Sequence, residues 1–278
     1  MSSPAAEAVM HEVQVEPVSK AGLRVSEVEY WRRYYLEPDV HYEWNDGRLE
    51  EKPVSDYETY LVYAWFTDLL RRFLSVHPIA AMVALEMGFR LPLPHKTVIR
   101  KPDLGVVTRG NPQPLLPLDC SYHGIFDLCI EALSDKERPG IERDAVTKKQ
   151  EYARAGVREY YILHREEGLM GFFRLDERGV YVPMERADGV IRSAVLPGFR
   201  FRVQDLLHQP QMDDLRGDPL YCDFVLPGWH EAERRADEEA QARRQAERRA
   251  EEASAARQSA EQEVERLRAM LARRGGDS

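Results

Sequence analysis

The chain has 278 residues, of which 39 are Lys or Arg and 48 are Asp or Glu, giving a formal net charge of −9. Its 43% hydrophobic content is enough for a sizeable core and excludes wholesale disorder. Residues 229–278 hold 12 acidic and 11 basic residues, so almost all of the negative charge belongs to residues 1–228. This excludes a protein that coats nucleic acid non-specifically, but it leaves room for a local basic cleft.

The cysteines and the hydropathy pattern indicate a cytoplasmic protein. Cys120, Cys129 and Cys222 have neither paired nor zinc-like spacing, which is typical of a reducing compartment. Cys129 lies within an apolar run and is expected to be buried. No apolar run approaches the roughly 20 residues that span a membrane, and the N-terminus lacks the pattern of a secretory signal. We therefore expect no membrane association.

Three zones follow from composition. Residues 1–22 are small and polar and are expected to be poorly ordered, whereas residues 23–228 mix strand-like and helix-like patterns in one domain. Residues 229–278 are rich in Ala, Glu and Arg, and contain no Pro and no Gly before Gly275. This last zone predicts a long helical tail.

The first half of the domain alternates short helices and strands. Ser26 and Glu29 have the spacing of a capping box, which predicts a helix start leading to residue 35. The segment HYEWNDGRLEEK predicts a hairpin around the turn Asn45-Asp46-Gly47. Residues 57–76 are helical by their four-residue apolar spacing, and residues 80–91 and 97–107 read as extended.

The second half has the order strand, helix, strand. FDLCIEAL, over 126–133, is a mostly apolar run that suits a strand covered on both faces. A helix over 143–155 follows, with Gly156 as its C-cap, and EYYILH predicts the next strand. Further β pattern covers residues 170–175, 180–183 and 199–203. We expect a mixed α/β core with a central sheet flanked by helices.

Apolar positions in the tail recur at steps of three or four residues, which is the spacing of a coiled-coil seam. A seam made mostly of alanine buries little area, so pairing through it would be weak without other contacts. A solvated single helix held by Glu/Arg neighbours fits the composition equally well. The seam residues are Ala253, Ala256, Ala260, Val264, Leu267 and Leu271.

Two acidic residues stand at the ends of apolar strands. Glu131 closes a strand that is buried on both faces, where an unpaired charge would cost several kcal/mol. Asp103 directly precedes the apolar run LGVV. If the two strands are neighbours, the carboxylates converge and offer the hard oxygen ligands that Mg²⁺ prefers. Alternatively, Asp103 caps a turn and Glu131 pairs with an arginine.

The following helix places Asp144, Lys148 and Tyr152 on one face, because they are four residues apart. An ammonium pointed toward two carboxylates could orient and activate a water for attack on phosphorus. Alternatively, Asp144 and Lys148 form an ordinary surface pair. Lys149 is one step round the helix and is expected to face solvent, although it could take the role of Lys148.

Five motifs in order carry a family resemblance: YEWNDGRL, KPDLGVV, IEALS, D-x-x-x-K-x-x-x-YARAGV-x-EYYIL and LPGF. In this order they resemble the Uma-two family of restriction-endonuclease-like proteins, part of the PD-(D/E)XK nuclease superfamily. The resemblance covers residues 26 to 207.

The resemblance implies a restriction-endonuclease-like fold and a set of site residues. Asp103 and Glu131 match the two metal-binding carboxylates, and Glu43 matches an acidic position that completes the site. Leu133 stands where the superfamily usually has its lysine, so the resemblance assigns that role to Lys148. The loop after Ser134 is longer than in most relatives, and the His that many of them carry near Thr59 is missing.

We therefore predict a Mg²⁺- or Mn²⁺-dependent DNA endonuclease, with Asp103 and Glu131 on the metal, Lys148 on the water and Glu43 assisting. A homodimer through the tail is expected. The alternative is an inactive nuclease fold that acts as a scaffold and recruits a partner through the tail. Basic residues near the motifs could contact phosphates, although solvation at the surface is their default state: Arg100, Lys101, Arg109, Lys136, Arg138 and Arg143.

Overall fold

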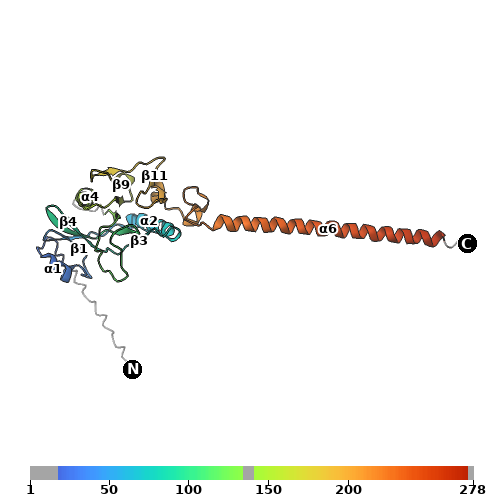
Figure 1. The fold of residues 1–278 in the computed structure, drawn as a ribbon, viewed down its shortest axis with the longest axis horizontal. Helices are drawn as coiled ribbons and strands as arrows, with labels where there is room; N and C mark the ends of the chain where they lie inside the picture. Colours follow the sequence, from blue (N-terminus) through green and yellow to red (C-terminus); the bar gives the residue numbers. More distant parts are fainter. Residues whose placement is uncertain (1–17, 134–140, 275–278) are drawn as a thin grey trace, which may run out of the picture. The chain divides into compact units, whose positions relative to one another are not determined.

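The computed structural model describes residues 18–133 and 141–274, which form two compact units, Met1–Val225 and Leu226–Ser278. The first unit contains all the strands and the second contains the long helix α6 (Figure 1). The predicted loop residues Lys136 and Arg138, and most of the segment 1–22, lie outside the described residues. Within the described ranges, no helix is long and apolar enough to cross a membrane.

The first unit is built on two larger sheets and a two-stranded ribbon. An antiparallel four-stranded sheet has the order β2-β1-β5-β4, and a mixed six-stranded sheet has the order β10-β9-β8-β7-β6-β3. Only β7 and β8 of the larger sheet run parallel. This confirms the mixed sheet that the strand–helix–strand order predicted. The strands are β1 (Tyr42–Asn45), β2 (Arg48–Glu51), β3 (Ala80–Val83), β4 (Phe89–Leu93), β5 (Lys96–Arg100), β6 (Leu104–Thr108), β7 (Leu128–Ala132), β8 (Glu159–Leu163), β9 (Gly171–Leu175), β10 (Tyr181–Pro183), β11 (Val190–Arg192) and β12 (Arg200–Arg202).

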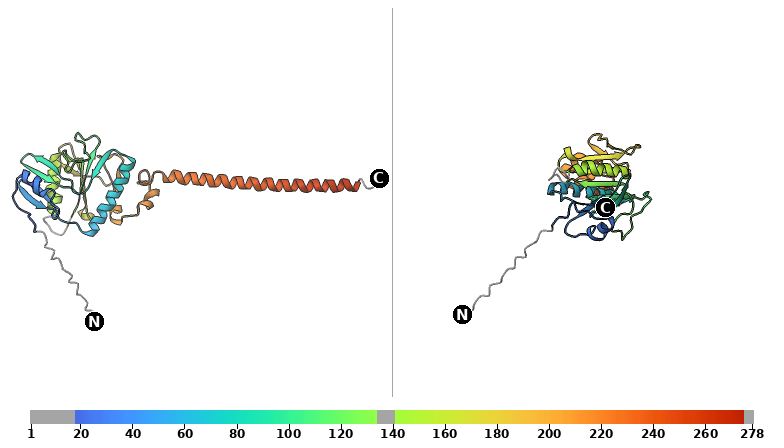
Figure 2. Two further views of the ribbon diagram at one scale, coloured as in Figure 1. Left: turned by 90° about the horizontal axis from the view of Figure 1, so that it is seen from below. Right: turned by 90° about the vertical axis from the view of Figure 1, so that its left-hand side faces the viewer.

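Helices cover both faces of the six-stranded sheet. Neighbouring residues of β8 point to opposite faces. Tyr160 packs edge-on against Tyr152 of α4, while Tyr161 packs edge-on against Phe66 of α2. The sheet therefore lies between α2 and α4, as the views in Figure 2 also show. The helical segments are α1 (Glu27–Glu29), η1 (Tyr30–Tyr34), α2 (Tyr57–Val76), η2 (Arg143–Lys148), α4 (Lys149–Ala155), η3 (Glu167–Leu169), α5 (Val203–His208), η4 (Met212–Gly217) and α6 (Trp229–Arg274).

The predicted turn and caps are present. Asp46 and Gly47 both have positive φ, at 46° and 91°, as expected for a two-residue hairpin turn that matches the twist of its strands. The Ser26 hydroxyl accepts a hydrogen bond from the backbone N–H of Glu29. Gly156 ends α4 with φ 91°, in the left-handed conformation that glycine adopts without strain.

The extended stretch predicted over 80–91 is wrong in one respect, because the chain turns within it. Leu85 and Glu86 adopt positive φ, at 61° and 56°, and separate β3 from β4, which belong to different sheets. Neither of the two turn residues is Gly, Asn or Asp, and Gly88 follows two residues later, so the local sequence did not place the turn at Leu85 and Glu86. The stretch over 97–107 is divided in the same way, since β5 and β6 also lie in different sheets.

The second unit holds the long C-terminal helix. Its helix α6 runs for 46 residues from Trp229 to Arg274 (Figure 1). Side chains over 231–268 are exposed, and intrahelical pairs such as Arg243–Glu247 and Arg257–Glu261 connect residues four apart. The helix is confirmed, whereas pairing with a second copy stays a prediction.

Candidate functional site

Strand pairing brings the two predicted carboxylates to the same end of the six-stranded sheet. Strands β6 and β7 are antiparallel neighbours, with Leu104 opposite Ile130. Asp103 and Glu131 each lie one residue beyond that pair. The carboxylate of Asp103 accepts a hydrogen bond at 2.6 Å from the backbone N–H of Ala132, directly beside Glu131.

Glu131 has buried partners on the helix that follows its strand. Its Oε1 lies 3.0 Å from Lys148 Nζ and accepts a hydrogen bond at 2.8 Å from the hydroxyl of Tyr152. Cys129 and Glu131 are two residues apart in β7, so their side chains lie on the same face of the sheet, which is the face that α4 covers. Burial raises the pKa of Glu131 to about 8, although Lys148 opposes the change and Asp103 adds to it. The arginine partner considered for Glu131 is therefore replaced by a lysine and a tyrosine.

Lys148 is the centre of a buried cluster of charges. Its Nζ lies 3.0 Å from Glu131, 3.1 Å from Asp144 and 3.3 Å from Glu43, and its side chain is fully buried. Burial alone would lower the pKa of Lys148, but these carboxylates raise it above its ordinary value. The lysine therefore remains an ammonium. The surface pair considered for Asp144 and Lys148 is wrong, since both residues are buried.

Lys149 faces elsewhere. Its Nζ lies 3.5 Å from the centre of the Phe173 ring, and burial lowers its pKa. The expectation that Lys149 simply faces solvent is therefore only partly right, because its side chain is half-buried. Of the two adjacent lysines, Lys148 is the one that contacts Glu131.

Glu43 lies in β1 and joins the same cluster from the four-stranded sheet. Its Oε1 accepts from the backbone N–H of Lys101 at 2.9 Å, and its Oε2 lies 3.1 Å from Arg100 Nη1. Burial would raise the pKa of Glu43, but Lys148 and Arg100 hold it well below its ordinary value. The sequence-predicted residue thus remains ionised and links the two sheets.

Arg100 and Lys101 are buried, so solvation at the surface, the default state expected for basic residues near these motifs, is wrong for these two. Arg100 is fully buried, where it binds Glu43, Glu50 and Glu151. Lys101 donates to the backbone carbonyl of Tyr35 at 2.7 Å. The apolar residues Val98 and Ile99 directly before Arg100 indicate a buried strand, which is a signal for its burial.

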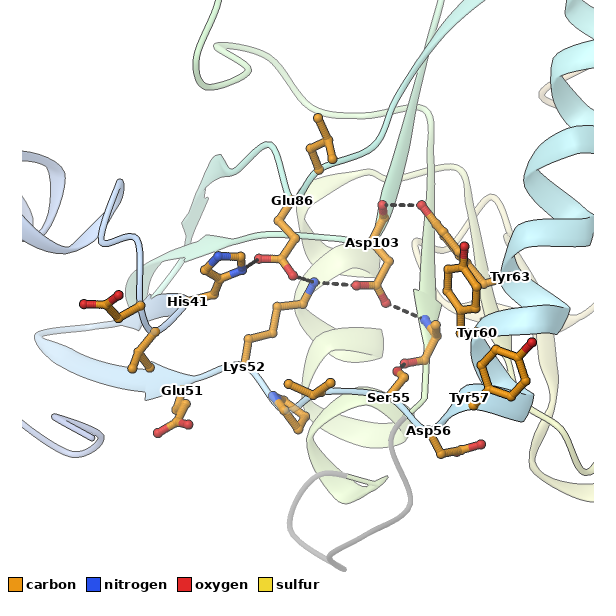
Figure 3. A pocket seen from close by; sticks show the side chains of 16 residues that line it. His41, Glu51, Lys52, Ser55, Asp56, Tyr57, Tyr60, Tyr63, Glu86 and Asp103 are labelled. Atoms are coloured by element: carbon orange, nitrogen blue, oxygen red, sulfur yellow. Dashed lines mark hydrogen bonds and ion pairs between the residues drawn. The ribbon is translucent and has the colours of Figure 1, made fainter. Parts of the chain in front are cut away.

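A second lysine, which the sequence reasoning missed, lies at Asp103. Lys52 Nζ is 2.5 Å from Asp103 Oδ1 and 3.4 Å from Glu86, whose other oxygen pairs with His41 (Figure 3). Burial would lower the pKa of Lys52, but Asp103 and Glu131 raise it. Lys52 follows the predicted hairpin, and nothing in its local sequence distinguishes it from a surface lysine.

Of the residues described above, His41, Lys52, Glu86 and Asp103 line a pocket of about 710 Å³. Glu43, Glu131 and Lys148 are buried and do not line it. One wall holds Asp103, whose backbone carbonyl accepts a hydrogen bond at 3.0 Å from Tyr63 (Figure 3). Tyr57 and Tyr60 line the pocket from the N-terminal turn of α2 (Figure 3). A small ligand or a single nucleotide unit fits a pocket of this size.

Two carboxylates at one end of a sheet are part of the donor set that a hard cation held partly by water needs. Mg²⁺ is commonly bound through one or two carboxylates and keeps several waters, and Asp103 and Glu131 supply two carboxylates at one end of the sheet. Among the described residues, no group of three or more His, Cys, Asp or Glu side chains is arranged to enclose a metal ion. Lys52 already neutralises Asp103, so a cation would have to share this carboxylate with it or displace it.

Comparisons with known proteins agree with this architecture. Residues 28–204 match the model of the Uma2 family, described as "Putative restriction endonuclease". The fold is similar to a crystal structure from Anabaena variabilis ATCC 29413 described as "a putative nuclease belonging to DUF820". That match has a TM-score of 0.53 and 13% sequence identity, and covers 66% of this chain and 98% of that one. A search of curated proteins found no match.

Proposed function

Because this chain belongs to the Uma2 family, we propose that it is an endonuclease that hydrolyses DNA phosphodiester bonds with Mg²⁺ or Mn²⁺. One observation carries the proposal: Asp103 and Glu131 lie at the same end of the paired strands β6 and β7, where the partly exposed Asp103 lines the pocket and Glu131 is buried. Mg²⁺ is commonly bound through one or two carboxylates and several waters, and Asp103 offers a carboxylate at a position that solvent and a phosphate can reach.

Each site residue has a distinct role in this proposal. Asp103 and Glu131 would hold the metal, which when bound supplies positive charge to a phosphate oxygen and lowers the pKa of a water. Lys148 keeps its proton and contacts three carboxylates, so it acts as a positioning residue that fixes Glu131 rather than as a base. Glu43 in turn orients Lys148. Tyr152 fixes the Oε1 atom of Glu131 by its hydrogen bond.

Plasmid cleavage tests the proposal. The purified full chain should nick or linearise plasmid DNA with Mg²⁺ or Mn²⁺, and Asp103→Asn and Glu131→Gln should each reduce the rate by roughly 100-fold or more. Glu177→Gln is the matched control, because it removes an exposed carboxylate from the turn between β9 and β10. Cleavage that survives both site substitutions in folded protein would refute the catalytic claim.

The ion pair between Lys52 and Asp103 favours a second candidate, an inactive nuclease fold that serves as an interaction scaffold. An ammonium on Asp103 removes the negative charge that would attract a cation. Calorimetry with Mn²⁺ separates the two candidates. A nuclease should bind Mn²⁺ and lose that binding in Glu131→Ala, whereas a scaffold should bind only after Lys52→Met has freed Asp103.

A further inference from the structure

Exposed aromatic rings form one wall of the pocket that contains Asp103. Tyr57 and Tyr60 are 73% and 53% exposed, and their ring centres lie 6.3 Å apart with 24° between the planes. Both line the pocket from the start of α2 (Figure 3). Much of each side chain is therefore accessible to a flat ligand that enters the pocket.

A strained turn supplies a second apolar element. Leu85 lines the same pocket, is 96% exposed, and has φ 61°, a conformation that is costly for a residue with a branched side chain. Its neighbour Glu86 has φ 56° and pairs with Lys52. The turn thus exposes the apolar side chain of Leu85 at the rim of the pocket, while Glu86 connects the turn to Asp103 through Lys52.

The charges of the pocket favour a neutral ring over a phosphate at this wall. Lys52 contacts both Glu86 and Asp103 and so balances one of these two carboxylates, and Asp56 pairs with Arg165 at 2.7 Å. The remaining lining residues include the acidic Asp39 and Glu51. A phosphate group would be repelled from the rim, whereas the face of a nucleobase carries no charge and stacks on tyrosine.

We propose that this pocket binds an unstacked nucleobase on Tyr57 and Tyr60, so that the substrate is single-stranded or locally unpaired DNA. The inference rests on the proposed function, because it places the base next to the phosphate at Asp103. In a duplex each base face is covered by its neighbours, and a base can reach a tyrosine only after leaving the stack. Unstacking a base costs the least free energy in single strands and at mismatches, so the pocket should prefer these substrates to intact duplex.

Binding measurements without divalent metal test the proposal. Fluorescence anisotropy of the full chain should give tighter binding to a labelled single-stranded oligonucleotide than to its duplex. Because stacking on an aromatic ring contributes about 1–3 kcal/mol per base, the double variant Tyr57→Ala/Tyr60→Ala should bind the single strand about 10-fold more weakly or worse. Tyr57→Phe/Tyr60→Phe keeps the rings and should bind like the wild type. Thermal melting checks that each variant is folded.

An abasic site adds an independent readout. Replacing the bases of the labelled single strand by abasic sites should weaken binding to the wild type, and should have little further effect on the double alanine variant. Equal affinity for single strand and duplex, or an alanine variant that binds normally, would overturn the nucleobase site. If Asp103-dependent plasmid cleavage persists in that case, the proposed nuclease function stands. If the wild type neither binds nor cleaves any DNA, both fail.

Discussion

Lys148→Met should destabilise the domain far more than the same change at its neighbour. The substitution removes an ammonium that lies within 3.3 Å of Glu131, Asp144 and Glu43, all of them buried. Glu43 retains Arg100, whereas Glu131 retains only the Tyr152 hydroxyl among its described partners. Removing one partner of a buried ion pair lowers the free energy of unfolding by about 3–5 kcal/mol, which is a large fraction of the stability of an ordinary domain.

Urea denaturation followed by tryptophan fluorescence measures this loss, with Lys149→Met as the matched control. Lys149 contacts the Phe173 ring and no carboxylate among its described contacts, so its loss should cost less than about 1 kcal/mol. The difference between the variants should shrink as the pH falls, because protonated carboxyl groups no longer need the ammonium. Equal midpoints for Lys148→Met and Lys149→Met would refute the assignment of Lys148 as the centre of the cluster.

Three further predictions concern other parts of the chain. Gly105→Ala should cost about 1–3 kcal/mol of stability in urea, because the new Cβ would lie 2.6 Å from the Phe126 ring, whereas Gly110→Ala meets nothing within 4 Å and should be nearly neutral. Folding lowers the pKa of Glu43, so the stability that its ionised form contributes is present above its ordinary pKa of 4.5 and is lost as the pH falls below that value. Glu43→Gln should therefore flatten the acid side of the curve of unfolding free energy against pH. An unchanged slope would contradict the ion-pair geometry. Deleting residues 229–278 should convert a dimer to a monomer in light scattering if the alanine seam pairs two chains, and an unchanged mass would show that α6 is not the dimer contact.

The helices, strands and turns that position the site could be predicted from the sequence, because each is determined by residues that are close together in the chain. The apolar run around Glu131 required a strand covered on both faces, and all four residues from Leu128 to Glu131 are buried. Asn45-Asp46-Gly47 required a two-residue turn, and Gly156 required a helix end. The four-residue spacing from Asp144 to Tyr152 placed these side chains on one face toward Glu131.

The remaining parts depended on contacts between distant segments. Lys52 reaches Asp103 across 51 residues and Arg100 reaches Glu151 across the same separation, so no local window contains either pair. The turn at Leu85 and Glu86 has no residue that favours positive φ. The strands before and after Asp103 belong to different sheets. This division depends on how the strands pair in the whole fold, and the apolar sequence over 97–107 does not encode it.

That change of sheet at Asp103 has a consequence for local unfolding. The three residues after β5 carry the chain from one sheet to the other, and Glu43 in the first sheet is bound both to the backbone of Lys101 and to Lys148. If either sheet opened alone, the buried charges at Glu43 and Lys148 would lose partners that the other sheet cannot replace. Amide hydrogens in β1, β5 and β7 should therefore exchange with one shared free energy, as a single cooperative unit that spans both sheets.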